Sequence, residues 1–217
     1  MFHVKQVSSQ NPLSPEAFAA EAGVSRETLA RLEIYAAQLR KWTKAINLVA
    51  PNTLPDLWRR HFLDSAQLYP LAAEQPGPWL DLGSGAGFPG LVIAALGREP
   101  LTLIESDIRK ATFLRETARQ MQVAATVRAE RIEAVDPASL PRPAVISARA
   151  LASLAELLDL AAPFMAADTL LLFPKGRQAE DELTLARESW TIDHVEMIPS
   201  RSDPAGRIIR LKGLRRK

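Results

Sequence analysis

Residues 79–90 read WLDLGSGAGFPG, and this stretch decides the fold. The apolar run 79–82 predicts a buried strand, and Pro89 fits the first turn of a helix that follows it. The loop between them has four glycines in eight residues, 83–90. Glycine lets a backbone approach a ligand closely, and open α/β sheets bind ligands at the carboxyl ends of their strands. The stretch therefore predicts a strand, a ligand-binding loop and a helix.

Downstream of this unit, short apolar runs alternate with helical patterns. Strands are expected at 101–105, 144–148 and 170–173, with a closing strand pair at 195–198 and 207–212. Helices are expected at 89–97, 107–121, 151–165 and 178–189, with Ser106 as the cap of the second. This alternation predicts an α/β fold with a doubly wound parallel sheet.

Upstream of the glycine loop the pattern is helical. Helices are expected at 15–22, 25–46 and 54–71, with Ser14 and Ser25 as caps and Gly23 as a stop. The run QPGP at 75–78 indicates a turn or linker. The sequence thus predicts an N-terminal helical cap over 1–75 and a ligand-binding core over 76–217.

Composition narrows the possible functions. The chain has 217 residues, 47% of them hydrophobic and 24% charged, and a net charge of +2 that does not by itself indicate a polyanionic partner. With no cysteine, disulfides, iron–sulfur clusters, cysteine-ligated zinc and thiolate catalysis are excluded, and no metal site is expected. The sequence has no apolar run long enough for a membrane span, and Met1 to Gln10 lacks a signal-peptide core. A cytoplasmic protein is expected.

The loop also indicates a class of cofactor. Phe88 stands where the dinucleotide-binding fingerprint needs its third glycine, which argues against a cofactor that contains a pyrophosphate, such as NAD. Glu105 closes the second expected strand, 22 residues after Gly83, where a carboxylate can accept both hydroxyls of a ribose. Loop and carboxylate together predict a nucleoside-bearing cofactor. They favour S-adenosylmethionine over NAD without separating the two cleanly.

Several motifs, in order, resemble the RsmG (GidB) family of bacterial methyltransferases that act on guanine N7 in small-subunit ribosomal RNA. The glycine loop matches the family's first motif, and the similarity covers roughly residues 25–212. The other matching motifs are Asn47-Leu48, residues 60–65 (RHFLDS), residues 105–107 (ESD) with Arg109-Lys110 and Phe113-Leu114, residues 131–133 (RIE), Arg149-Ala150 with residues 152–154 (ASL), and Lys175-Gly176. The resemblance implies a Rossmann-like class I methyltransferase fold with an N-terminal helical cap, S-adenosylmethionine as cofactor and 16S ribosomal RNA as partner.

The resemblance also implies which residues contact the cofactor. They are Gly83, Gly85, Phe88, Glu105, Ser106, Asp107, Ile132, Glu133 and Arg149. Two departures stand out: Glu105 replaces the aspartate of many members, and Ala144 stands where many have an aspartate. The nearby residues 128–130 (RAE) are an alternative match for Ile132-Glu133.

Guanine N7 has a lone pair and no proton, so its methylation needs no general base, and no catalytic residue is assigned. Positioning of the two reactants is expected to supply the rate. Expected RNA contacts are Arg60, His61, Lys175, Arg177 and Arg210. For His61, a polar network that packs helices is an equally good interpretation. The basic C-terminal segment is either an RNA-backbone patch or a solvated tail. A monomer is expected.

Two other functions are compatible with parts of this pattern. An NAD-dependent oxidoreductase shares the strand–loop–acid arrangement, but Tyr35 and Tyr69, the only tyrosines, lie outside the α/β part. A non-catalytic RNA-binding or ribosome assembly factor on a methyltransferase fold is the second alternative. Binding of the methyl donor separates all three.

Overall fold

The computed structural model describes residues 11–217, so the segment Met1 to Gln10 lies outside the described residues. The centre of the protein is a seven-stranded sheet with the strand order β3-β2-β1-β4-β5-β7-β6. The strands are β1 Trp79–Leu82, β2 Leu101–Ile104, β3 Thr126–Arg128, β4 Val145–Ala148, β5 Leu170–Lys175, β6 Trp190–Pro199 and β7 Arg207–Arg216. Strands β1 to β5 pair in parallel, while β7 runs antiparallel to both β5 and β6. The predicted doubly wound sheet with a closing strand pair is confirmed.

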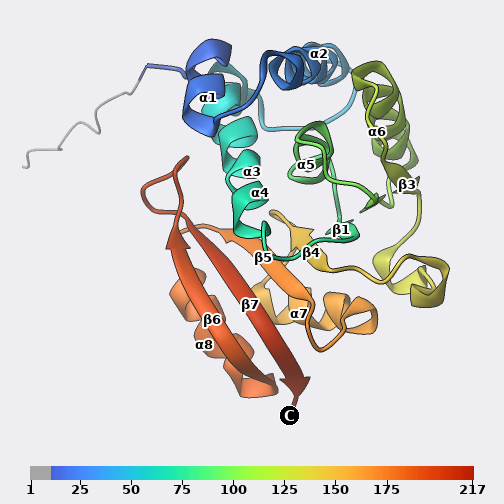
Figure 1. Ribbon diagram of the computed structural model, residues 1–217, viewed down its shortest axis with the longest axis vertical. Coiled ribbons are helices and arrows are strands. Elements are labelled where there is room, and N and C mark those ends of the chain that lie inside the picture. The colour runs from blue at the N-terminus through green and yellow to red at the C-terminus, as the bar shows by residue number, and fades with distance from the viewer. Residues whose placement is uncertain (1–10) are drawn as a thin grey trace, which may run out of the picture.

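Helices cover both faces of the sheet (Figure 1). On one face, α5 (Gly90–Ala95) and α6 (Ile108–Met121) share a hydrophobic core with the N-terminal helices. On the other face, α7 (Leu154–Ala161) and α8 (Ala179–Ser189) form a second core. Three short 3-10 turns complete the core region: η3 Ile132–Ala134, η4 Pro137–Ser139 and η5 Ala162–Phe164.

The N-terminal region is helical, as predicted. It contains α1 (Pro15–Ala22), α2 (Arg26–Trp42), the 3-10 helix η1 (Pro51–Asp56), the π-helix η2 (Trp58–Leu63), and the short helices α3 (Asp64–Ala66) and α4 (Leu68–Leu71). Ser14 and Ser25 cap the first two helices, and Gly23 ends α1 in a left-handed conformation. The structure differs at 54–71, where a single helix was expected. Pro55 and Pro70 have no N–H group for an α-helical bond, so the segment is a series of shorter helices.

Two other boundaries differ from expectation. Helix α2 ends at Trp42 rather than near Ile46, because the amides of Ala45 and Ile46 both bond to the Trp42 carbonyl in a turn. Helix α6 is capped by Asp107, whose carboxylate accepts from the Arg109 and Lys110 amides at 2.8 and 3.3 Å, and not by Ser106.

The helices of residues 11–75 do not form a separate layer. Phe18, Tyr35 and Phe62 belong to the same buried cluster as Phe88 of the glycine loop and Leu103 of β2. The boundary at 75–76 stays a prediction. Within residues 11–217 no helix has the length and apolar character needed to cross a membrane.

Candidate active site

The glycine loop leaves β1 and enters α5 at the carboxyl edge of the sheet. Asp81, at the third position of β1, anchors this loop. Its carboxylate accepts from the Ser147 hydroxyl at 2.6 Å and from the Gly90 amide at 3.3 Å. Gly90 has no room for a side chain, since a Cβ would lie 2.2 Å from a Leu103 methyl and 2.8 Å from the Asp81 carboxylate. Asp81 is fully buried, and this burial raises its pKa to about 6. The loop thus rests on a buried carboxyl group that the sequence analysis did not single out.

Glu105 fastens the loop from the β2 side. One carboxylate oxygen accepts from the Gly85 amide at 2.7 Å and the other from the Asp107 amide at 2.8 Å. The side chain is 7% exposed. Each carboxylate oxygen can accept more than one hydrogen bond, so Glu105 retains acceptor capacity toward the adjoining pocket.

That pocket has a volume of about 400 Å³ and is lined by almost all of the predicted cofactor residues. Asp107 is not in its wall, because its carboxylate caps α6. The sequence offers two alternative motif matches near residue 130, and each contributes a wall residue, because Glu130 and Glu133 both line this pocket. Sequence analysis missed Leu48, Lys110 and Leu151 as wall residues. The predicted residues in the wall are Gly83, Gly85, Phe88, Glu105, Ser106, Ile132, Glu133 and Arg149.

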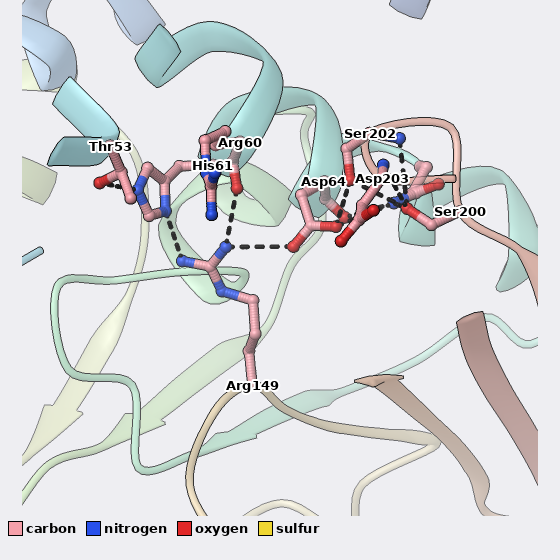
Figure 2. A network of polar contacts seen from close by, with 9 residues as sticks. Thr53, Arg60, His61, Asp64, Arg149, Ser200, Ser202 and Asp203 are labelled. Carbon is pink, nitrogen blue, oxygen red and sulfur yellow. Dashed lines mark hydrogen bonds and ion pairs between the residues drawn. The ribbon is translucent and has the colours of Figure 1, made fainter. Parts of the chain in front are cut away.

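Arg149, just after β4, is the centre of a polar network (Figure 2). Its guanidinium donates to the Asp64 carboxylate at 3.1 Å, to the Arg60 carbonyl at 3.2 Å and to His61 Nδ1 at 2.8 Å. It also lies 5.0 Å from the centre of the Phe88 ring. Arg60 and His61 lie in η2 and Asp64 lies in α3, so the N-terminal region fixes the arginine that borders the glycine-loop pocket.

The same network fixes the protonation of His61. Thr53 donates its hydroxyl proton to the Ala50 carbonyl at 2.6 Å, so it accepts from His61 Nε2 at 2.8 Å. Nδ1 then accepts from Arg149, and the ring is the neutral Nε2–H tautomer. Burial, with the positive charges of Arg149 and Arg60, lowers the pKa of His61 to about 3. Both ring nitrogens are occupied, so His61 has no free lone pair for a substrate proton.

A second pocket, of about 660 Å³, lies beside the first. Arg149 and Ala150 line both, so the two cavities share a wall. The far wall is the loop between β6 and β7, which is tied to α3 by a 2.6 Å hydrogen bond from the Ser202 hydroxyl to Asp64 (Figure 2). Eight charged side chains line it together with the neutral His61: Asp56, Arg60, Asp64, Arg149, Lys175, Glu182, Asp203 and Arg207.

The structure brings together only some of the expected RNA contacts. Arg60, His61 and Lys175 line the second pocket, whereas Arg177 is exposed outside it. Arg210 lies on β7 in an ion pair with Glu196 at 2.8 Å. Lys175 is itself engaged: its ammonium donates to Glu182 at 2.7 Å and to the Ala152 carbonyl at 2.6 Å.

Comparison with known proteins identifies the group to which this arrangement belongs. A family model described as GidB, rRNA small subunit methyltransferase G, matches residues 28–208. The chain belongs to the GidB family. A curated GidB relative from Rhodospirillum centenum, named ribosomal RNA small subunit methyltransferase G, is 58% identical over 194 residues, covering 89% of this chain and 88% of the relative. One of the same name from Parvibaculum lavamentivorans is 54% identical over 203 residues, covering 92% and 89%.

Solved structures agree on the fold. The N-methyltransferase NodS from Bradyrhizobium japonicum, in complex with S-adenosyl-L-homocysteine, superimposes with a TM-score of 0.56 at 17% identity, covering 83% of this chain and 98% of NodS. The predicted Rossmann-like class I fold is therefore confirmed. GidB membership also confirms a methyltransferase of ribosomal RNA that uses S-adenosylmethionine, and it does not favour the oxidoreductase or the non-catalytic alternative.

Proposed function

We propose that this chain methylates N7 of a guanine in 16S ribosomal RNA, with the methyl donor in the glycine-loop pocket and the acceptor base in the second pocket. The observation that carries this proposal is the wall that the two pockets share at Arg149 and Ala150. A methyl transfer needs donor and acceptor in contact, and two adjoining cavities on the ligand-binding edge of the sheet meet that need.

The residues of the first pocket suit S-adenosylmethionine. Glu105 is placed to accept from the ribose hydroxyls while its backbone partners hold it still. Ile132 and Glu133 form the wall for the adenine, and Phe88 with Arg149 closes the side toward the second pocket. Ser106 and Asp107 continue the turn that orients Glu105. When bound, the cofactor supplies a methyl group on a positively charged sulfur.

The chain's own residues act by positioning. Guanine N7 carries no proton, so no base is required, and the neutral, fully engaged His61 fits this chemistry. Arg149 is held by Asp64, Arg60 and His61, so it presents a fixed face to both pockets.

RNA contacts are proposed for the cations at the pocket mouths. Arg60 and Arg207 line the second pocket and Lys110 and Arg131 line the first, and within residues 11–217 none of these four is in an ion pair of 4.0 Å or less with a carboxylate. Such groups are free to bind phosphate. Arg177, His61, Lys175 and Arg210 stay proposals as RNA contacts. To bind RNA, Lys175 and Arg210 would first have to leave Glu182 and Glu196, and the His61 ring nitrogens would have to leave Thr53 and Arg149.

The setting of this activity is also proposed. A substrate of ribosomal RNA is consistent with a protein that works in the cytoplasm, away from membranes. We propose that it acts as a monomer. Residues 1–75 serve as a cap that supplies Arg60, His61 and Asp64 to the core.

The test is transfer of labelled methyl from S-adenosylmethionine to small subunits from a strain that lacks the gene, followed by digestion to nucleosides. We expect label in N7-methylguanosine at one site of 16S ribosomal RNA. Label in another nucleoside would overturn the N7 assignment. Cofactor binding without any transfer to subunits or free RNA would indicate a different acceptor.

A further inference from the structure

Tyr35 of α2 is a polar residue in an otherwise apolar place. It is fully buried in the cluster that joins the N-terminal helices to the glycine loop. Its ring lies nearly parallel to Phe88, with centroids 5.0 Å apart, and meets Phe62 edge-on at 5.2 Å. A phenylalanine would pack in the same way, so ring packing does not explain the hydroxyl.

The hydroxyl group contacts the glycine loop directly. It donates to the Ala86 carbonyl at 2.5 Å. The hydroxyl oxygen also packs closely against Gly87, because a Cβ added to Gly87 would lie 2.7 Å from it. Burial raises the pKa of Tyr35 well above its usual value, so the hydroxyl keeps the proton that it donates.

This contact complements the one made by Glu105. Ala86 and Gly85 are neighbours in the wall of the first pocket. Glu105 holds the Gly85 amide from the β2 side, and Tyr35 holds the Ala86 carbonyl from the α2 side. Without the second contact the Ala86 carbonyl would lose the hydrogen bond that α2 supplies, and its peptide would be held only by the bond from the Gly87 amide to the Ser84 carbonyl at 2.7 Å.

We propose that Tyr35 is a positioning residue for the cofactor, acting through the Ala86 carbonyl to hold the glycine loop in its binding conformation. The proposal rests on the assignment of the first pocket to S-adenosylmethionine. It gives the N-terminal cap a direct part in cofactor affinity.

The test compares Tyr35→Phe with Tyr69→Phe, the same substitution at the only other tyrosine. Tyr69 lies in α4, is 37% exposed and is not part of either pocket wall. Binding of S-adenosylhomocysteine is measured by calorimetry on the full chain. We expect the dissociation constant to rise about tenfold in Tyr35→Phe, the size of one lost buried hydrogen bond, and to stay unchanged in Tyr69→Phe.

Hydrogen exchange provides the readout that a merely structural role would not move. Amides of residues 83–88 should exchange faster in Tyr35→Phe, while the strands β4 and β5 keep their protection. A lower melting temperature with unchanged cofactor affinity would overturn the proposal, because Tyr35 would then only stabilise the fold. If the unmodified chain itself does not bind the ligand, the assignment of the first pocket fails instead.

Discussion

Glu105→Gln is the sharpest test of the cofactor site, because the change keeps the size of the side chain and removes one acceptor and the charge. The carboxylate now accepts from the Gly85 and Asp107 amides at 2.7 and 2.8 Å, one on each oxygen. Glutamine has a single acceptor oxygen, so its amide nitrogen must face one of the two N–H groups. One half-buried backbone amide is left without a partner.

Two effects follow from this geometry, and they have separate magnitudes. The unpaired amide should lower the free energy of unfolding by about 1–3 kcal/mol. The ribose contact that we propose for Glu105 loses its charge. A hydrogen bond to a charged group is worth about 1.5–3 kcal/mol, so cofactor affinity should fall by about 10- to 150-fold. Glu105→Asp keeps the charge, but the shorter side chain cannot reach both amides. Its cofactor affinity should therefore lie between that of the unmodified chain and that of Glu105→Gln.

Calorimetric titration with S-adenosylhomocysteine measures the affinity, and urea denaturation measures the stability. Glu116→Gln is the matched control, since Glu116 lies on α6 and pairs with Arg119 outside both pockets. The reasoning is refuted if Glu105→Gln loses stability as expected but binds the ligand as tightly as the unmodified chain. Glu105 would then fasten the loop without touching the ribose.

Three further outcomes are expected. With a pKa of about 3, His61 should contribute no step to the rate of methyl transfer between pH 5 and 8; a step near pH 6 that disappears in His61→Asn would contradict this. Folding raises the pKa of Asp81 from 3.8 to about 6, so ionisation destabilises the folded chain by about 3 kcal/mol in total as the pH rises from below 4 to above 7. Between pH 5 and pH 8, urea denaturation should show about 1.4 kcal/mol of this loss in the unmodified chain and less in Asp81→Asn. An equal loss in both proteins would argue against it. For RNA binding, Arg207→Ala should lower the slope of log affinity against log salt concentration by about 1. The control is Arg215→Ala, which removes an arginine paired with Asp193 and should leave the slope nearly unchanged. Equal reductions in the two variants would place Arg207 outside the RNA surface.

Much of the fold could be predicted because its signals are local. A buried four-residue strand followed by a glycine loop is visible within residues 79–90, and the alternation of strands and helices repeats that pattern. Strand β3 was missed because it has only three residues, none of them fully buried, so it has no apolar run. The cap of α6 was placed one residue early because Ser106 and Asp107 are both good caps, and only the backbone direction decides between them.

The candidate site could be predicted only where its residues follow one another in the chain. The glycine loop and Glu105 lie on adjacent strands, so one stretch of sequence contains both. Arg207 comes from the far end of the chain, and no spacing links it to Arg60 in the same pocket. Lys175 pairs with Glu182 on the next helix, and residue type alone does not tell a free lysine from a paired one, so its contact with RNA stays a prediction.

The contacts around Phe88 show how the N-terminal region and the sheet meet beside the glycine-loop pocket. The ring has Tyr35 and His61 stacked near it, each with its centroid 5.0 Å away, and the Arg149 guanidinium at 5.0 Å. Tyr35 and His61 come from the N-terminal helices, and Arg149 comes from the end of β4. The wall that the two pockets share at Arg149 is therefore held in place by residues of the N-terminal region. Because the proposed in-line methyl transfer depends on the separation and direction of two reactants, a rigid wall held by both regions would fix that geometry.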